Sequence, residues 1–259
     1  MIKGAIFDVD GTILNSMGIW NDVGAIYLRK KNKIPKEGLG EILYSMSLTE
    51  GAKYMIDNYY LDNSVEEIIE GVLSIINDFY LHEVQTKNGV VNLLKFLRKN
   101  NIKMIVATSS DYNQIDKAFK RLKIRNFFID ILTCETVGKS KSYPDIYLNC
   151  AEILGTKPEE TLVFEDALFA IKTAEKANFK VVGVYDPAEM KNKNSIQSLV
   201  KYYIQDFSKV ADWGHHLRSL YKINAEKTRE ENPLLTNGLA FSFRKQGGFY
   251  VHSINNRWK

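Results

Sequence analysis

The sequence contains little cysteine and no long apolar run, and these two absences exclude several classes of protein. Two cysteines, Cys134 and Cys150, in 259 residues are too few for a disulfide framework or a cysteine-based metal site. No stretch is typical of a transmembrane helix, and Asp8 and Asp10 interrupt the first apolar segment, so neither a signal peptide nor a transit peptide fits. We therefore expect a cytoplasmic protein that has no membrane partner.

The composition is that of a folded domain, with the excess of positive charge at its C-terminal end. Hydrophobic residues make up 45% and charged residues 25% of the chain, as is usual for globular proteins. Of the 35 Lys/Arg and 31 Asp/Glu residues, eight basic and three acidic ones lie in 214–259, which leaves 27 basic against 28 acidic elsewhere. Such a segment can contact nucleic acid or another anionic surface, although a solvated tail is the simpler explanation.

Short apolar strands alternate with amphipathic helices along most of the sequence. The segment 89–100 places apolar residues at helical spacing, and 144–154 begins a second such helix with Pro144. This series predicts an α/β fold, a doubly wound parallel sheet covered on both faces, in which ligands bind beyond the carboxyl ends of the strands. The five predicted strands are 4–10, 102–110, 127–133, 160–166 and 179–185.

One segment after the first strand breaks this alternation. From 16 to 86 the apolar spacing is helical throughout, which predicts an all-helical insert. Ser64 and Glu67 match the capping box Ser-x-x-Glu, and Asn15 and Ser16 are candidates for a hinge or a helix cap. The predicted helices of the insert lie near 17–31, 49–60 and 64–81.

Three regions follow from this pattern. The core comprises 1–15 and 87–207, the helical insert 16–86, and a basic C-terminal extension 208–259. In the extension, 239–254 alternates apolar and polar residues around a Gly-Gly pair, as a β-hairpin does, and such a hairpin is stable only when packed on the core or a partner. Its interleaved basic and aromatic residues can bind single-stranded nucleic acid, a partner that nothing else in the sequence requires.

Two carboxylates close the first predicted strand, in the stretch IFDVDGT (6–12). Residues two apart on an extended chain project from the same side, so we expect Asp8 and Asp10 to converge. The stretch does not match a calcium loop of the D-x-D-x-[DN]-G type, because Thr12 and Ile13 stand where that loop needs an acidic or amide residue and a glycine. A solvated turn is the remaining alternative.

A second acidic pair, Glu165 and Asp166, ends another predicted strand. If this pair joins Asp8 and Asp10, four formal negative charges share one site, and such carboxylates repel one another unless a cation compensates them. Ligands that are all oxygen favour a hard divalent ion, and Mg²⁺ commonly takes one or two carboxylates and leaves its other positions to water and phosphate. These residues therefore predict a Mg²⁺ site.

Together with two further positions, these residues resemble the motifs of the haloacid dehalogenase-like superfamily of aspartate-nucleophile phosphohydrolases. FDVDGT (7–12) resembles the first motif, Thr108 at the end of IKMIVAT the second, Lys141 in GKSKSYPDIY the third, and the Glu-Asp pair of VFEDALFAI the fourth. The resemblance covers about 1–207. It is to subfamily IA, which includes β-phosphoglucomutases and phosphatases, and it implies a Rossmann-like core with the insert as a helical cap.

The resemblance implies a phosphatase that acts on a small phosphorylated metabolite with Mg²⁺ as its cofactor. Asp8 is then the nucleophile that forms an aspartyl-phosphate, and Asp10 is the general acid and base. Asp8, Asp10, Glu165 and Asp166 are the implied metal-binding residues.

The resemblance also implies how phosphate is held. Thr108 and Lys141 are the implied phosphate-binding side chains, with Ser109 beside them contributing its backbone, and Lys139 competes with Lys141 for the role of the lysine. The helical cap is expected to close over the site, exclude water and select the leaving group.

Other activities of this scaffold and one non-enzymatic role are the alternatives. Dehalogenases lack the second aspartate and the metal, so Asp10 and the acidic pair argue against them. Sugar-phosphate mutases of the β-phosphoglucomutase type carry an arginine after a Gly-x-Ser in the cap, whereas 45–48 reads Ser-Met-Ser-Leu here, which favours a simple hydrolase. A non-catalytic binding protein that uses the basic tail is the alternative of another class. The sequence does not specify the oligomeric state.

Overall fold

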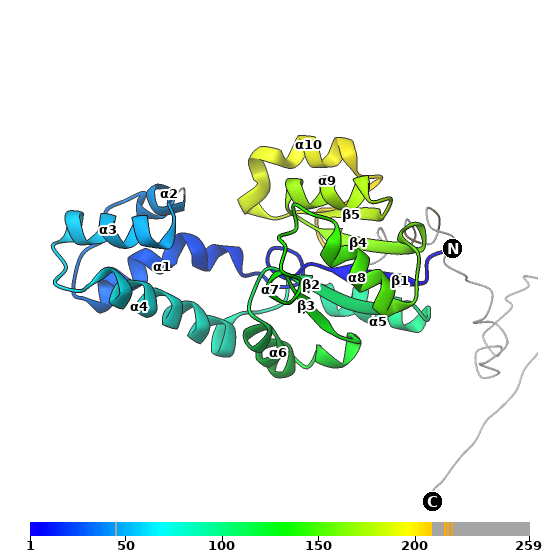
Figure 1. Ribbon diagram of the computed structural model, residues 1–259, viewed down its shortest axis with the longest axis horizontal. Helices are drawn as coiled ribbons and strands as arrows, with labels where there is room; N and C mark the ends of the chain where they lie inside the picture. Colours follow the sequence, from blue (N-terminus) through cyan, green and yellow to red (C-terminus); the bar gives the residue numbers. More distant parts are fainter. Residues whose placement is uncertain (45, 209–214, 216, 218, 220–259) are drawn as a thin grey trace, which may run out of the picture. The chain divides into compact units, whose positions relative to one another are not determined.

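The computed structural model of the chain describes residues 1–44, 46–208, 215, 217 and 219 (Figure 1). The hairpin expected at 239–254 lies outside the described residues, as does most of the basic extension. The fold is therefore described for the remainder, which includes all the predicted site residues.

Six parallel strands form one sheet in the order β3-β2-β1-β4-β5-β6. Strand β1 lies in the middle, where its Phe7 pairs with Val106 of β2 on one side and Phe164 of β4 on the other. The predicted doubly wound parallel sheet is confirmed. The strands are Gly4–Phe7 (β1), Lys103–Thr108 (β2), Ile131–Thr133 (β3), Thr161–Glu165 (β4), Lys180–Val184 (β5) and Tyr202–Ile204 (β6).

The strands differ from the sequence prediction at their ends and in number. The first was expected to continue to residue 10 but ends at Phe7, because the carbonyl oxygen of Val9 accepts the backbone N–H groups of Ile13 and Leu14 and turns the chain. Strand β6 was not predicted, since three residues are too short to show an alternating pattern.

Helices cover both faces of the sheet (Figure 1). They are Val90–Lys99 (α5), Tyr112–Arg121 (α6), Cys134–Val137 (α7), Asp145–Leu154 (α8), Leu168–Lys176 (α9) and Lys193–Leu199 (α10). Successive side chains of a strand point to opposite faces. Phe7 and Val106 accordingly join the apolar cluster that includes α5 and α6, whereas Ile6 and Ala107 join the cluster that includes α8, α9 and α10.

The segment between β1 and α5 is helical, as predicted. Helix α4 begins after Ser64 with the predicted capping box to Glu67, and helix α3 begins after Ser47 with a second box to Glu50 that was not predicted. No helix in the described part of the chain is long and apolar enough to cross a bilayer. The helices are Met17–Lys30 (α1), Leu39–Tyr44 (α2), Leu48–Tyr59 (α3) and Val65–Asp78 (α4), followed by a π-helical turn at Phe79–Glu83 (η1).

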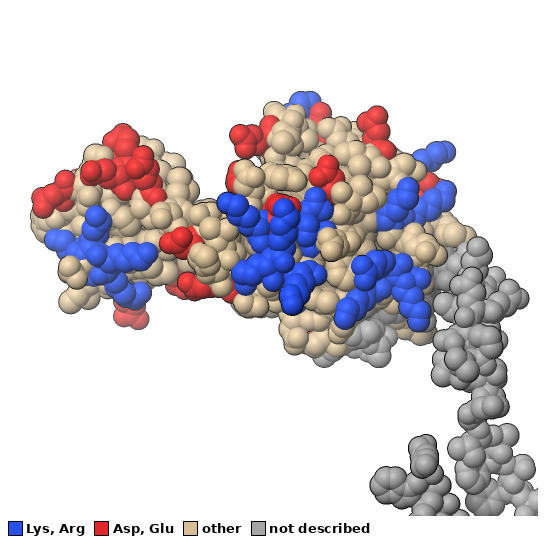
Figure 2. Space-filling model, turned by 90° about the horizontal axis from the view of Figure 1, so that it is seen from below, with Lys and Arg blue, Asp and Glu red and all other residues tan. Residues whose placement is uncertain are grey.

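Charge is unevenly distributed over the surface of the described residues. Figure 2 shows Lys and Arg side chains gathered on one face. Helices α5 and α6 each end in two basic residues, Arg98 and Lys99 in the first and Lys120 and Arg121 in the second. Positive charge in the last turn complements the helix dipole. Basic residues therefore cluster in the folded part of the chain as well as in the C-terminal extension.

Candidate active site

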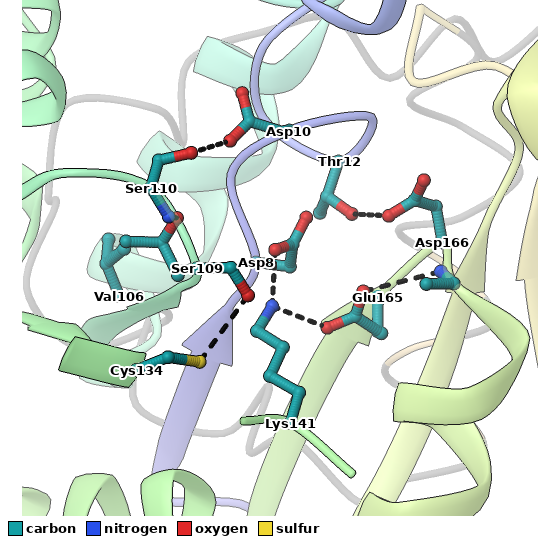
Figure 3. Close-up of polar contacts among 12 residues, drawn as sticks. Asp8, Asp10, Thr12, Val106, Ser109, Ser110, Cys134, Lys141, Glu165 and Asp166 are labelled. Carbon is teal, nitrogen blue, oxygen red and sulfur yellow. Dashed lines mark hydrogen bonds and ion pairs between the residues drawn. The ribbon is translucent and has the colours of Figure 1, made fainter. Parts of the chain in front are cut away.

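Three strand ends bring the predicted site residues to one edge of the sheet. Asp8 follows β1, Thr108 is the last residue of β2, and Glu165 is the last residue of β4. Strands β2 and β4 flank β1, and the winding of the chain reverses here, which is where α/β sheets bind ligands. Figure 3 shows the side chains of Asp8, Lys141 and Glu165 grouped beyond these strand ends, with Asp166 beside them.

Asp8 is buried, and within the described residues one of its carboxylate oxygens has no partner. Lys141 donates a hydrogen bond to Oδ1, whereas Oδ2 has none. The pKa of Asp8 is raised to about 7, because burial and then the negative charge of Glu165 raise it more than Lys141 lowers it. A buried carboxylate oxygen without a partner is costly, so this atom is the one available to a cation or an electrophile.

Lys141 bridges two carboxylates at the centre of the site. Its Nζ donates to Asp8 and, over 2.9 Å, to Oε2 of Glu165. Burial alone would lower the pKa of Lys141, but the charges of Asp8 and Glu165 raise it well above its usual value, so the ammonium group keeps its proton. The competing candidate, Lys139, lies at the surface and pairs with Asp145 at 2.6 Å. The structure thus brings Lys141, and not Lys139, to Asp8.

The carboxylates of Asp8, Glu165 and Asp166 could hold a metal ion. All three residues are buried, and one oxygen from each lies within 4.8 Å of the others. Burial, and then the charges of Asp8 and Glu165, raise the pKa of Asp166 well above its usual range. Three carboxylate oxygen donors therefore fit a hard divalent cation such as Mg²⁺.

Gly11 and Thr12 hold the turn after Asp8 against Asp166. Gly11 has a φ of +83°, and a Cβ at this position would lie 2.2 Å from Oδ2 of Asp166. Only glycine combines this backbone angle with so close an approach. Thr12 donates its hydroxyl to Oδ1 of Asp166 over 3.2 Å. The first and fourth motifs are thus in direct contact.

Asp10 was expected to converge with Asp8, and its charge raises the pKa of Asp8, but it does not belong to the group of three acids that could hold a metal ion. Its Oδ1 accepts hydrogen bonds from the hydroxyls of Ser16 (2.6 Å) and Tyr80 (2.5 Å), and its Oδ2 from that of Ser110 (2.5 Å). The extended strand ends before Asp8, so the alternation on which the expectation depended no longer applies. Ser16 precedes α1 but makes no side-chain cap bond, because its hydroxyl is used by Asp10.

The turn after β2 contributes hydroxyl groups. Thr108 is buried, and its Oγ1 accepts the backbone N–H of Ser110 over 3.0 Å. The side chain of Ser109 is exposed, with Oγ 3.4 Å from the sulfur of Cys134. The predicted Thr108 therefore shapes the turn that directs Ser110 to Asp10, and the Ser109 hydroxyl lies against Cys134.

Besides Ser16, which was predicted only as a hinge or helix cap, four side chains that bond the predicted carboxylates were not identified as site residues from the sequence. Ser110 lies two residues beyond Thr108, and this spacing could have indicated it. Tyr80 and Tyr147 lie within helical segments, where apolar spacing hides the function of a single hydroxyl, and Tyr147 donates to Oε2 of Glu165 over 3.1 Å. The fourth is Thr12, which sequence reasoning considered only as a calcium ligand that does not fit.

A second buried ion pair supports the site from the side of the cap connection. Nζ of Lys87 lies 2.8 Å from Oδ2 of Asp186, and both side chains are largely buried. The charge of Asp186 raises the pKa of Asp166, and that of Lys87 lowers it. The backbone N–H of Lys87 donates to the carbonyl oxygen of Ile13, which joins the end of the helical insert to the first motif.

Comparison with known proteins leads to the same family that the sequence motifs resemble. Residues 5–184 match the family model of the haloacid dehalogenase-like hydrolases. The chain is 23% identical, over 71% of its length, to 85% of a phosphorylated carbohydrates phosphatase from Thermotoga maritima. It is 28% identical, over 75% of its length, to 88% of hexitol phosphatase A from Escherichia coli. Among solved structures, the β-phosphoglucomutase of Clostridium difficile superposes with a TM-score of 0.59 at 21% identity, over 86% of this chain and 100% of the other.

Proposed function

Because the chain belongs to the haloacid dehalogenase-like hydrolase family, we propose that it is a Mg²⁺-dependent phosphatase that hydrolyses a small phosphorylated metabolite through an aspartyl-phosphate on Asp8. The observation that carries the proposal is the unpartnered Oδ2 of Asp8 beside a buried lysine and two further buried carboxylates. The names of the T. maritima and E. coli relatives support a phosphatase. We place the reaction in the cytoplasm.

The first step transfers the phosphoryl group to the protein. Oδ2 of Asp8 attacks phosphorus, the bond from phosphorus to the ester oxygen breaks, and Asp10 gives its proton to the departing alcohol. Lys141, bonded to Oδ1, orients the attacking carboxylate and brings positive charge beside the phosphoryl oxygens. Thr108 and the backbone N–H of Ser109 contribute further donors to these oxygens.

The second step releases phosphate. Asp10 takes a proton from a water molecule, the water oxygen attacks phosphorus, and the bond from phosphorus to Asp8 breaks. The hydroxyls of Ser16, Tyr80 and Ser110 hold Asp10 in one orientation for both proton transfers. General acid and base catalysis of this kind contributes about 10²- to 10⁴-fold to the rate.

The residues that would hold Mg²⁺ in this scheme are Asp8, Glu165 and Asp166. Bound Mg²⁺ supplies positive charge that lets one anion approach another and that stabilises the equatorial oxygens of the phosphoryl group. Unaided hydrolysis of phosphate monoesters is so slow that an enzyme must lower the barrier by about 20 kcal/mol or more. The proposal therefore requires the nucleophile, the acid and base, the lysine and the metal to act together.

Replacement of Asp8 by asparagine tests this proposal. Asp8→Asn keeps the shape of the side chain but removes the nucleophile, so we expect Mg²⁺-dependent phosphate release from a panel of phosphorylated metabolites to fall by at least about 10³-fold. Asp62→Asn changes an exposed aspartate between α3 and α4 and should keep the wild-type rate. Full turnover by Asp8→Asn, or an equal loss in both variants, would refute the proposal.

A sugar-phosphate mutase of the β-phosphoglucomutase type is the second candidate, supported by the fold shared with the C. difficile enzyme. The resemblance implies that such mutases hold a second phosphate with an arginine of the cap. Here the half-exposed Leu48 stands at that position, and the hydroxyl of Ser47 is engaged with Glu50. Added glucose-1,6-bisphosphate should therefore release phosphate without forming an isomerised sugar phosphate.

A non-catalytic binding protein is the candidate of another class. Its proposed contact surface, the basic tail, lies largely outside the described residues. An RNA shift in gel electrophoresis by the full chain, but not by residues 1–210, together with an absence of turnover would favour it over the phosphatase.

A further inference from the structure

The helical insert contains an apolar cavity of about 360 Å³, which is separate from the charged cluster. It lies among α1, α2, α3, α4 and the turn after α2, and fourteen described residues line it. Of these, Trp20 and Ser47 alone carry a hydrogen-bonding side chain, and the hydroxyl of Ser47 is already bonded to Glu50. The volume is within the range of small-molecule sites. The side chains that line the cavity are therefore almost all apolar.

One side of α1 connects this cavity to the proposed acid and base. Ser16, just before α1, donates its hydroxyl to Asp10. Trp20, one turn later, lines the cavity, and its side chain lowers the pKa of Tyr80, whose hydroxyl also donates to Asp10. Gly24, a further turn along, lines the cavity as well. Residues four apart share one face of a helix, so a continuous stripe of about 12 Å leads from Asp10 into the cavity.

We propose that this cavity receives the leaving group of the substrate, and that the substrate is a phosphate monoester of an apolar alkyl or aryl alcohol. This inference rests on the proposed phosphatase function and specifies its substrate class. A polyol in the cavity would bury hydroxyl groups without partners, at a cost of about tenfold in affinity for each. Each methylene group moved from water into the cavity gains up to about fourfold instead.

Small residues of α3 make room for such a group. Gly51 and Ala52 are buried and line the cavity. A Cβ at Gly51 would meet a methyl group of Leu43 at 3.6 Å, an ordinary contact, and no other atom within 4 Å. Alanine at this position should therefore fit and favour the helix, and a larger side chain would extend into the cavity. The site can thus be filled by substitution without touching the catalytic cluster.

Matched substrates test the proposal. Hexyl phosphate and sorbitol 6-phosphate both release a primary six-carbon alcohol and differ in the hydroxyl groups of the leaving group. We expect kcat/KM to be at least about tenfold higher for hexyl phosphate, and to rise from ethyl through butyl to hexyl phosphate by up to about fourfold per methylene. Equal or faster turnover of sorbitol 6-phosphate would overturn the apolar assignment and leave the phosphatase assignment standing.

A filled cavity should remove this preference. In Gly51→Leu, the advantage of hexyl over ethyl phosphate in kcat/KM should fall by at least about tenfold. Gly51→Ala should keep most of the preference. Lys53→Leu adds the same side chain at an exposed position of the same helix and should change nothing. If Gly51→Leu keeps the full preference, the cavity does not hold the leaving group; if it does not fold, the wild-type series decides.

Binding of alkylphosphonates separates this inference from the proposed function, because these compounds have no ester bond to hydrolyse. Calorimetry should show hexylphosphonate binding at least about tenfold more tightly than ethylphosphonate in wild type, and about equally in Gly51→Leu. If no phosphate ester is turned over, the phosphatase proposal fails, and a chain-length dependence that is lost in Gly51→Leu still supports an apolar ligand site. Equal binding of the two phosphonates would overturn that site.

Discussion

The charged cluster at the edge of the sheet and the apolar cavity of the insert differ in what they bury. The cluster places Asp8, Lys141, Glu165 and Asp166 out of water and bonds most of their oxygens, although Oδ2 of Asp8 has no partner among the described residues. None of the described residues that line the cavity carries a charged side chain. Buried charge is tolerated only where each group has a partner, so few residue types fit the cluster. Many apolar residue types can line a cavity. The sequence therefore specifies the reaction more tightly than it specifies the substrate.

The largest effect is expected from removal of the buried positive charge of Lys141 from the charged cluster. Lys141→Met should lower kcat/KM for any phosphate ester by about 10²- to 10³-fold or more, because Asp8 and Glu165 lose their shared partner and the phosphoryl group loses a positive charge. The matched variant Lys139→Met removes a surface charge that pairs with Asp145 and should stay within twofold of wild type. Steady-state kinetics at saturating Mg²⁺ measure both. A comparable loss in Lys139→Met would show that the wrong lysine has been placed in the site.

A pair of glycines tests whether the contact between the first and fourth motifs is specific. Gly11→Ala should raise the Mg²⁺ concentration needed for half-maximal activity by about tenfold or more, since its Cβ would strike Asp166. Gly38→Ala has a similar positive φ, +74°, but nothing lies within 4 Å of the added carbon. It should cost about 1 kcal/mol of stability through the backbone alone and leave the Mg²⁺ requirement unchanged. Equal Mg²⁺ requirements in the two variants would exclude the contact as the cause.

These contrasts show how far the sequence alone could predict the molecule. The parallel sheet and the helical insert could be predicted, because apolar periodicity is local and repeated. The resemblance favoured Lys141 over Lys139, but only the structure shows that Lys141 contacts Asp8. The hydroxyls of Tyr80 and Ser110 come from elements 70 and 100 residues away from Asp10 in the chain. Such pairings depend on the packing of the insert and the sheet, which no local pattern encodes.

Tyr80 lies in the helical insert and bonds Asp10 at the edge of the sheet. Its replacement should lower activity less than the changes above. Tyr80→Phe removes one of three hydroxyls that orient Asp10, so kcat should fall by about tenfold with KM within twofold. Tyr27→Phe is the matched control in the insert, because the buried hydroxyl of Tyr27 has no hydrogen-bond partner among the described residues. Its removal should leave kcat unchanged and stability equal or higher. A drop in kcat for both variants would indicate a general disturbance of the insert.

Buried acids should make the metal-free protein less stable as the pH rises. The pKa of Asp8 is raised from 3.8 to about 7, and that of Asp166 is raised too, so the folded state holds these protons more tightly than the unfolded chain. With a chelator present, Tm should therefore fall between pH 5 and pH 8. Mg²⁺ should raise Tm more at pH 8, where the acids are ionised, than at pH 5.

The control for this pH dependence is Asp166→Asn, which removes one of the two acids. Its Tm in chelator should change less with pH, and Mg²⁺ should stabilise it less. Surface carboxylates with lowered pKa values, such as Glu50 and Glu160, act in the opposite direction, but their effect is confined to pH values below about 5. A Tm in chelator that rises from pH 5 to pH 8 would contradict the assignment of the buried acids.

The smallest expected effects concern stability, and they test whether the helical insert and the sheet unfold together. Ser64→Ala removes the cap of α4 in the insert, and Asp111→Ala removes the side chain that caps α6 beside the sheet through the N–H of Gln114. Each should cost about 1 kcal/mol, or about 2–4 °C in Tm. Apolar residues of the insert and the sheet, among them Ile68 and Phe7, share one buried cluster, so both variants should shift a single calorimetric transition. A separate transition moved by Ser64→Ala alone would show that the insert unfolds independently of the sheet.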